Sequence, residues 1–297
     1  MLVQRAVFTS LRTGQNEGYQ LAAVSPGVSA DEARELACWG PGHDSIYAFA
    51  RQVTSMHRMR CGTFCLTRTR GVGKEYSGRG GERVYTWFFL VGNDVFDRFA
   101  FHPFRMLQAL TAAGYTDILE PASPRLEPIQ LVGRASSIDV QNLEHITQQI
   151  GPLGLATLLN AAIITDRLGV TTEVRADRLL TALLDLLPPS HRGELSLTTG
   201  LRVSPRRPYR IHVLPRDPAE QRAATRRLPL TRISLRDDPS GQFAPQYGWP
   251  LRMYRLLKEQ QFDAIAQIIH GLRGKPIDDL DCLAELTPVT GHGVIPD

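Results

Sequence analysis

The sequence predicts an α+β fold of two domains, and three observations lead to that prediction. The 297 residues are enough for one large or two ordinary domains. Hydrophobic residues make up 42% of the chain and charged residues 22%, which is typical of a soluble globular protein. Strand-like patterns dominate up to the proline-rich residues 120–128, and helical patterns dominate after them. We therefore expect a domain with a mixed or antiparallel sheet at residues 1–133, followed by a helix-rich domain with a central strand pair at residues 134–297.

The expected first domain is built mainly from strands. Strand-like patterns lie at residues 2–11, 18–25, 45–70 and 84–91. The last of these runs is apolar almost throughout, which predicts a strand buried on both faces of its sheet. Ser29 and Glu32 have the spacing of a capping box and predict the start of a helix after the second strand. A further helix is expected at residues 104–113, because Pro103 suits its first position.

Helical patterns fill most of the expected second domain. They lie at residues 140–150, 153–164, 178–187 and 251–269, and the last is the longest. A short strand is expected at residues 170–174. Residues 194–199 and 209–214 are rich in β-branched and aromatic residues and predict the central strand pair. Pro205 and Pro208 should hold the connection between these two strands stiff.

The connection between the paired strands carries a concentration of arginines. Its four guanidinium groups belong to Arg202, Arg206, Arg207 and Arg210. We expect these four side chains to project outward and to bind a partner, because a rigid loop that concentrates one charge usually binds something. The stretch Arg202–Arg236 has ten arginines and two acidic residues, whereas the formal net charge of the whole chain is +4. Such a local excess can steer an acidic partner.

Three interpretations of the basic stretch stay open. The arginines could pair with the chain's own carboxylates, with an acidic protein, or with nucleic acid. Against nucleic acid, the stretch contains one aromatic residue, Tyr209, and so lacks a platform on which bases could stack. We favour an acidic protein partner over nucleic acid.

The sequence has no motif from which a catalytic residue, a cofactor site or a metal site could be assigned, and we expect none. The glycine-rich residues 71–81 do not match a phosphate-binding loop, because Glu75 follows Lys74 where that loop needs serine or threonine. We expect a flexible connection there. Asp185 and Glu194 are expected to be solvated carboxylates and not catalytic acids or bases.

The cysteines and histidines lack the spacing of metal ligands. The four cysteines are Cys38, Cys61, Cys65 and Cys282, without the two paired knuckles of a zinc site. We expect all four to be reduced and mostly buried. Among the histidines, His212 is expected to pack in the core or against a neighbouring strand.

The N-terminal residues lack the apolar core and cleavage site of a secretion signal. No apolar run approaches the roughly 20 residues that a membrane-spanning helix needs. We therefore expect a cytoplasmic protein without membrane contact.

Four runs of the sequence, taken in order, are similar to one known family. They are VFTS at residues 7–10, GYQLAAVSPGVS at residues 18–29, the strand-like residues 83–91 and the helix start His102-Pro103-Phe104. Together they resemble the type-2 N-terminal module of the GTPase-associated protein family of bacterial conflict systems. Residues 183–200 and 207–215 resemble the middle module of that family.

The resemblance implies a non-enzymatic adaptor or regulatory subunit that works beside a small Ras-like GTPase in a bacterial conflict, defence or signalling system. It brings no catalytic residues with it. Two alternatives stay open. One is a hydrolase or transferase with a non-standard site between the domains, and the other is a nucleic-acid-binding protein that uses the stretch Arg202–Arg236.

Overall fold

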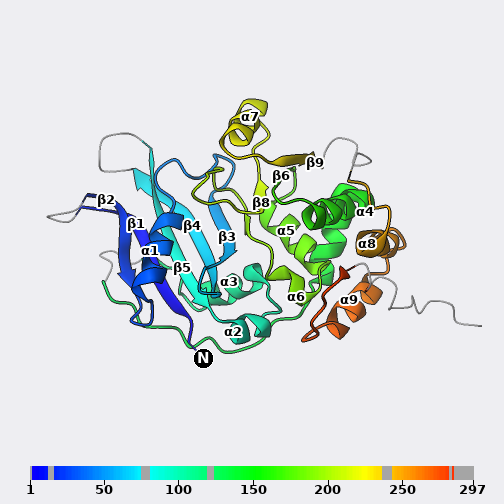
Figure 1. The fold of residues 1–297 in the computed structure, drawn as a ribbon, viewed down its shortest axis with the longest axis horizontal. Helices are drawn as coiled ribbons and strands as arrows, with labels where there is room; N and C mark the ends of the chain where they lie inside the picture. The colour runs from blue at the N-terminus through cyan, green and yellow to red at the C-terminus, as the bar shows by residue number, and fades with distance from the viewer. Residues whose placement is uncertain are drawn as a thin grey trace, which may run out of the picture.

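The computed structural model describes residues 2–12, 17–74, 81–118, 124–235, 243–280 and 283. Five strands belong to the first part of the chain: β1 (Gln4–Arg12), β2 (Glu17–Val24), β3 (Gln52–Arg58), β4 (Phe64–Lys74) and β5 (Glu82–Val91). Four belong to the later part: β6 (Leu168–Thr171), β7 (Leu197–Thr198), β8 (Ile211–Val213) and β9 (Thr231–Ser234). All of these form one sheet in the order β2-β1-β5-β4-β3-β7-β8-β6-β9 (Figure 1). The α+β class predicted from the sequence is confirmed.

The sheet is mixed, and its two halves differ in strand direction. From β2 to β7 each neighbouring pair is antiparallel, whereas β7, β8, β6 and β9 pair in parallel. The predicted strand pair is therefore present as β7 and β8, with two and three residues. Their parallel pairing means that the chain must return along the length of β7 before β8 begins.

Helices cover both faces of the antiparallel half. On one face, Leu36 of α1 (Ala30–Trp39) packs in a buried cluster with Phe88 and Leu90. On the other face, Leu107 of α3 (Pro103–Ala112) shares the main core with Phe89. Alternate residues of β5 thus point into different layers, and the predicted two-sided burial of this strand is confirmed.

Helix α1 begins where the sequence predicts it. The Ser29 Oγ accepts a hydrogen bond from the Glu32 backbone N–H at 3.2 Å, and the Glu32 carboxylate accepts one from the Ser29 backbone N–H at 2.9 Å. This reciprocal pair satisfies two backbone donors that the first helical turn cannot satisfy itself.

The later part of the chain supplies most of the helices. They are α4 (Val140–Ile164), α5 (Ala176–Asp185), α6 (Pro189–Arg192), α7 (Pro218–Arg227), α8 (Gly248–Lys258) and α9 (Phe262–Gly271), and α2 (Asn93–Arg98) lies in the earlier part. The predicted break between residues 150 and 153 is confirmed, since Gly151 has a φ of 75° inside α4. The single helix predicted at residues 251–269 is wrong. Gln260 has a φ of 57°, which helical backbone cannot adopt, so α8 and α9 are separate.

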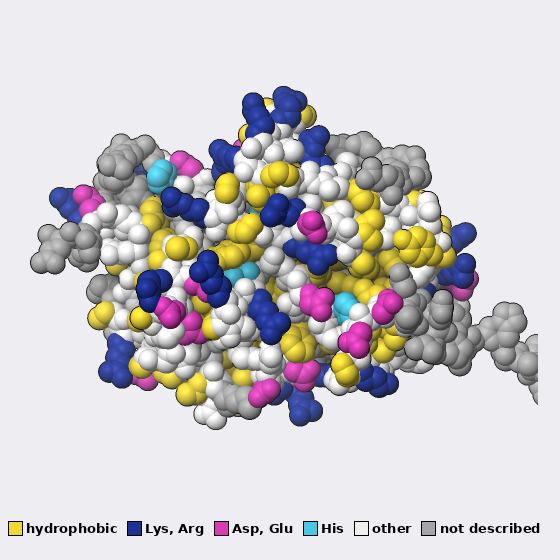
Figure 2. Space-filling view, in the orientation of Figure 1, with side chains coloured by type: hydrophobic (Ala, Val, Ile, Leu, Met, Phe, Trp, Pro, Cys, Tyr) yellow, Lys and Arg dark blue, Asp and Glu magenta, His cyan; other side chains and the backbone are white. Residues whose placement is uncertain are grey.

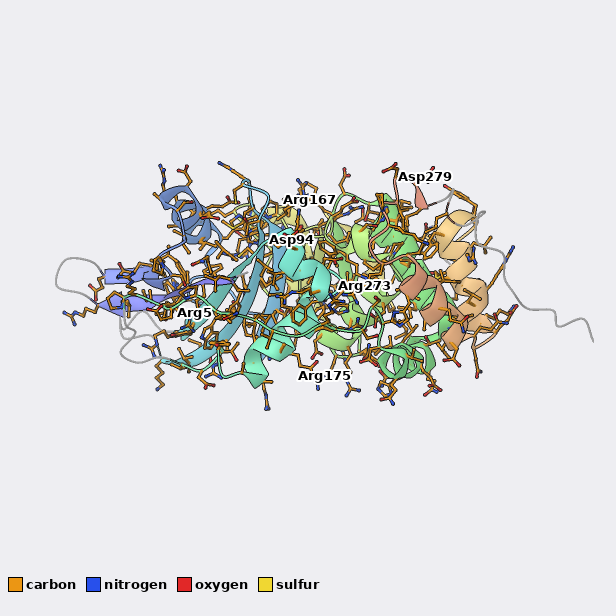
Figure 3. The ribbon with its side chains drawn as sticks, turned by 90° about the horizontal axis from the view of Figure 1, so that it is seen from below. Arg5, Asp94, Arg167, Arg175, Arg273 and Asp279 are labelled. Carbon is orange, nitrogen blue, oxygen red and sulfur yellow. The ribbon has the colours of Figure 1, made fainter. Side chains whose placement is uncertain are left out.

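Contacts cross the predicted boundary at residue 133. The strand β3 pairs with β7, and Trp87 and Trp249 are buried in the same core cluster. The Arg273 guanidinium after α9 donates hydrogen bonds to the carbonyls of Asp97 and Arg98 in α2, both at 2.9 Å, and Figure 3 shows Arg273 beside that helix. The two parts therefore share a sheet and a core, and the division into two domains stays a prediction. No helix in the described ranges is both long and apolar enough to cross a membrane.

Candidate functional site

The connection between β7 and β8 is packed against the chain along much of its length. The backbone N–H of Tyr47 donates to the Gly200 carbonyl at 2.9 Å, and the backbone N–H of Arg202 donates to the Ser45 carbonyl at 2.7 Å. Leu201 and Tyr209 are buried in one small hydrophobic cluster. The connection is thus a folded segment whose direction is set by these contacts.

Two of the four arginines that were predicted to bind a partner form contacts within the protein instead. Arg207 is 8% exposed, and its guanidinium donates to the Gly40 carbonyl at 3.4 Å. The Arg210 guanidinium donates to the carbonyls of Ile163 at 2.8 Å and Thr165 at 3.1 Å, at the C-terminal end of α4. These carbonyls have no partner within their own helix, so Arg210 acts as a cap. The expected outward projection is therefore wrong for Arg207 and Arg210.

Of the other two arginines, Arg202 forms contacts within the protein, whereas Arg206 faces solvent. The Arg202 guanidinium pairs with the Glu220 carboxylate at 3.0 Å and lies 5.1 Å from the centre of the Tyr47 ring. Its side chain is 33% exposed. The side chain of Arg206 is exposed, and no ion pair to it is found among the residues that the structure describes. Of the four arginines, Arg206 therefore has the expected outward-facing side chain. The role of all four in partner binding stays a prediction.

Helix α7 was missed by the sequence interpretation, which expected no helix between residues 187 and 251. The Asp217 side chain caps the helix by accepting a hydrogen bond from the Ala219 backbone N–H at 2.9 Å, and Pro218 occupies the first turn. This Asp-Pro start with Glu220 in the first turn is a signal that could have located the helix. The apolar periodicity was too weak to do so, because Ala224 is the one fully buried residue in α7.

Three exposed arginines lie on α7, and we call them the α7 basic face: Arg222, Arg226 and Arg227. Figure 2 shows Lys and Arg side chains gathered over α7, which projects from the top of the molecule in Figure 1. Within the described part of the chain, none of the three has an ion pair. The two acidic residues at the start of this helix have other partners. Glu220 pairs with Arg202, and Asp217 accepts a hydrogen bond from the backbone N–H of Ala219.

The α7 basic face costs the helix some stability. Arg222 and Arg226 are four residues apart, so their like charges lie on the same side of the helix and destabilise it by roughly 0.2–0.5 kcal/mol. Arg226 and Arg227 lie in the last turn, where the helix dipole favours positive charge. The net result is a solvent-exposed positive surface that can attract an acidic molecule.

Asp185 is not the solvated carboxylate that the sequence suggested. It is fully buried, it pairs with the Arg105 guanidinium, and it accepts a hydrogen bond from the Asp139 backbone N–H at 3.0 Å. His102 Nε2 lies 3.5 Å from the Asp185 carboxylate. Burial alone would raise the pKa of Asp185, but His102 and the charges of Arg105 and Arg192 hold it below its ordinary value. Asp185 therefore joins helices, while Glu194 is exposed as predicted.

Three histidines are buried in packing positions. The His57 ring stacks on Trp39 with 3.7 Å between ring centres, and burial lowers its pKa to about 3. Burial also lowers the pKa of His102 and of His212 to about 4. The imidazoles are therefore neutral at pH 7. The predicted core position of His212 is confirmed, because its side chain is fully buried.

The other candidate groups give no site. The expected flexible connection is wrong for residues 71–74, which belong to β4, and residues 75–80 lie outside the described ones. Cys38, Cys61 and Cys65 are free thiols, and Cys65 is buried as predicted, whereas Cys282 lies outside the described residues. The expected burial is wrong for Cys38 and Cys61, which are exposed. In the ranges that the structure describes, no group of three or more His, Cys, Asp or Glu side chains could hold a metal ion.

The comparison with known families concerns the antiparallel half of the sheet. Residues 2–131 match the family model of GTPase-associated protein 1, N-terminal domain type 2. The matched residues include β1 to β5 and α1 to α3. The resemblance predicted for the N-terminal module is thereby confirmed, and the description of the family points to association with a GTPase. The likeness of residues 183–200 and 207–215 to a middle module stays a prediction. No curated protein and no solved structure matches the chain.

Proposed function

We propose that the protein is a non-enzymatic adaptor or regulatory subunit that binds a small GTPase through the α7 basic face. The observation that carries the proposal is the set of three exposed arginines on α7, without ion pairs in the described structure, in a chain whose residues 2–131 match a GTPase-associated domain. On the family resemblance, we place this adaptor in a bacterial conflict or defence system.

The character of the basic surface favours an acidic protein over nucleic acid. Binding of single strands relies on exposed aromatic side chains that stack with bases. Tyr209, the aromatic residue of the basic stretch, is 1% exposed and cannot supply such a platform. Exposed guanidinium groups on a short helix suit the carboxylates of a protein surface, which they can bind in two-point contacts.

The positions of the titratable groups favour an adaptor over an enzyme. His57, His102, His212 and Asp185, whose pKa values are shifted, are almost fully buried, whereas His191, whose pKa is also lowered by burial, is partly exposed. A catalytic acid or base must come within hydrogen-bond reach of a substrate. These four side chains support packing and helix contacts instead.

The test is a binding measurement with the small GTPase that co-purifies with the full-length protein from native lysate. The GTPase is purified and loaded with GDP or with a non-hydrolysable GTP analogue. We expect the triple variant Arg222→Ala, Arg226→Ala, Arg227→Ala to associate about tenfold more slowly at about 50 mM salt, because electrostatic steering is lost. A single Arg206→Ala variant tests whether the surface extends to the β7–β8 connection.

A matched control removes the same charge from other places. Arg60, Arg134 and Arg255 are exposed arginines distant from α7 in sequence, and their triple alanine variant also lowers the net charge by three. It should associate within about twofold of the wild-type rate if the effect is local. Equal association rates for both triple variants and the wild type would show that α7 does not contact the GTPase.

A further inference from the structure

The parallel half of the sheet contains a topological switch point between β6 and β8. These two strands are adjacent and parallel. From β6 the chain passes through α5 to β7, which lies on the far side of β8. From β8 it passes through α7 to β9, which lies on the far side of β6. The two helices pack on opposite faces, because Leu183 of α5 shares a cluster with Val213, whereas Ala224 of α7 shares one with the next residue, Leu214. In open sheets with parallel strands, ligands bind at the carboxyl ends of the strands where the connections part in this way.

A cleft of about 1,530 Å³ lies at these carboxyl ends. Residues 172–178, which follow β6, and residues 213–216, at the end of β8, form one side of it. Residues of α3, residues 48–51 before β3 and Gln52 at the start of β3 also line it. Arg175 of the first wall lies at the margin of the molecule in Figure 3. The cleft is larger than the roughly 300–1,000 Å³ of ordinary small-molecule sites.

The acidic side chains of the cleft already have contacts. Asp177 pairs with Arg175 at 2.6 Å, Glu173 with Arg216 at 3.6 Å, and Glu220 with Arg202 at 3.0 Å. The fourth carboxylate of the lining, Asp139, accepts a hydrogen bond from the Asn142 backbone N–H at 3.0 Å as the cap of α4. The negative charges of the lining are thus largely offset within the protein.

Three arginines of the cleft are left without such a partner. In the described residues, no hydrogen bond or ion pair engages the guanidinium groups of Arg51, Arg68 or Arg178. Arg68 rises from β4 directly opposite Thr54 of β3, and its Nε is buried without a hydrogen-bond partner. A buried donor without an acceptor costs about 1–3 kcal/mol. Asp177 attracts Arg68 electrostatically, although the two do not form an ion pair.

We infer that this switch-point cleft binds a phosphorylated small molecule of about nucleotide size. Guanidinium groups bind phosphate oxygens through two parallel hydrogen bonds, and Arg68 of β4 and Arg178 of α5 both line the cleft. The amide side chains of Gln52, Gln108 and Gln141 line the same cleft and can hydrogen-bond the polar body of a nucleoside. None of the three arginines of the α7 basic face lines the cleft, although Glu220 of the same helix does.

The experiment uses the full-length protein purified free of any GTPase, with isothermal titration calorimetry as the readout. The probes are ATP, GTP, their diphosphates, inorganic pyrophosphate and a glutamate-rich peptide. We expect saturable binding of at least one phosphorylated probe with a Kd below about 100 μM. Tighter binding of a nucleotide than of pyrophosphate would identify a nucleoside phosphate, and equal binding would identify recognition of the phosphates alone.

Variants decide whether the binding occurs in the cleft. Arg178→Gln and Arg68→Gln should each weaken binding about tenfold, whereas Arg255→Gln on α8 should leave it unchanged. Arg178 is exposed, so its substitution reports on binding even if Arg68→Gln disturbs folding. No saturable binding of a phosphorylated probe up to about 1 mM, binding of the peptide alone, or full affinity in Arg178→Gln would overturn the inference. These measurements do not involve the GTPase. Failure of this inference would therefore not contradict the proposed adaptor function, which is tested separately.

Discussion

A single buried carboxylate connects three helices. Asp185 at the end of α5 contacts Arg105 and His102 at the start of α3 and the backbone of Asp139 before α4. We expect Asp185→Ala to lower the free energy of unfolding by about 3–5 kcal/mol, because Arg105 and the buried Arg192 would lose their negative partner. Urea unfolding of the variant measures this loss. Glu194→Ala, the control at an exposed carboxylate, should change it by less than about 0.5 kcal/mol. A similar small effect at Asp185 would show that the network does not hold the helices together.

The buried histidines predict a loss of stability in mild acid. His57, His102 and His212 have folded-state pKa values of about 3, 4 and 4, below the ordinary 6.5. Below pH about 6.5 the unfolded chain binds protons on these rings and the folded chain does not, so stability is full above that pH and falls as the pH drops towards 4. Each histidine should contribute about 1.4 kcal/mol per pH unit in this window.

Urea unfolding at pH 7 and at pH 5 tests the effect of the histidines. The free energy of unfolding should be lower at pH 5, and His57→Phe should reduce the difference by about one third while it preserves the stack on Trp39. Equal stability at the two pH values would show that the imidazoles are accessible to protons in the folded state.

At the scale of single elements, α7 combines weak packing with a charge pattern that does not favour its own stability. We expect Arg222→Glu to preserve or raise the free energy of unfolding, by up to about 0.5 kcal/mol, because the introduced carboxylate would attract Arg226 one turn later where the native guanidinium repels it. The same change should weaken binding to the GTPase. Thermal unfolding and binding measured on one preparation separate the two effects. Lower stability with unchanged binding would contradict a role for α7 as a docking helix.

The elements that were predicted correctly from the sequence are those whose own residues carry a clear signal. The capping box at Ser29 and Glu32 marked α1, and the apolar run in β5 marked a strand buried on both faces. The separation of α8 from α9 has no such signal, because Gln260 adopts a positive φ without glycine or proline at the break. The parallel pairing of β7 and β8 could not be predicted either, because strands of two and three residues are too short for their sequence to indicate a direction.

The candidate site was predictable in composition but not in geometry. The excess of arginine between residues 202 and 236 was visible, and α7 lies inside that stretch. Whether each guanidinium faces solvent depends on contacts with distant residues, such as Gly40 for Arg207 and the end of α4 for Arg210. Those contacts exist only in the folded chain, so the four residues chosen from the sequence include two that are used internally.

At the scale of the whole molecule, the matched N-terminal segment and the later part of the chain share one sheet. Helix α7, with its basic face, belongs to the later part and projects at the top of Figure 1. The cleft lies at the carboxyl ends of β6 and β8 and is lined by residues of both parts. The segment that matches a GTPase-associated domain contributes the β3 and β4 side of the cleft, including Arg68. The two proposed binding surfaces therefore lie on one continuous sheet framework.

The salt dependence of affinity between the full-length protein and the small GTPase isolated with it tests the proposed docking surface most directly. We predict that the wild-type Kd rises steeply between about 50 and 300 mM salt, because the exposed guanidinium groups of α7 attract the partner through solvent. The triple alanine variant at Arg222, Arg226 and Arg227 should bind more weakly at low salt and with a much flatter dependence. Identical salt dependence in the variant and the wild type would contradict the claim that the α7 basic face is the docking surface.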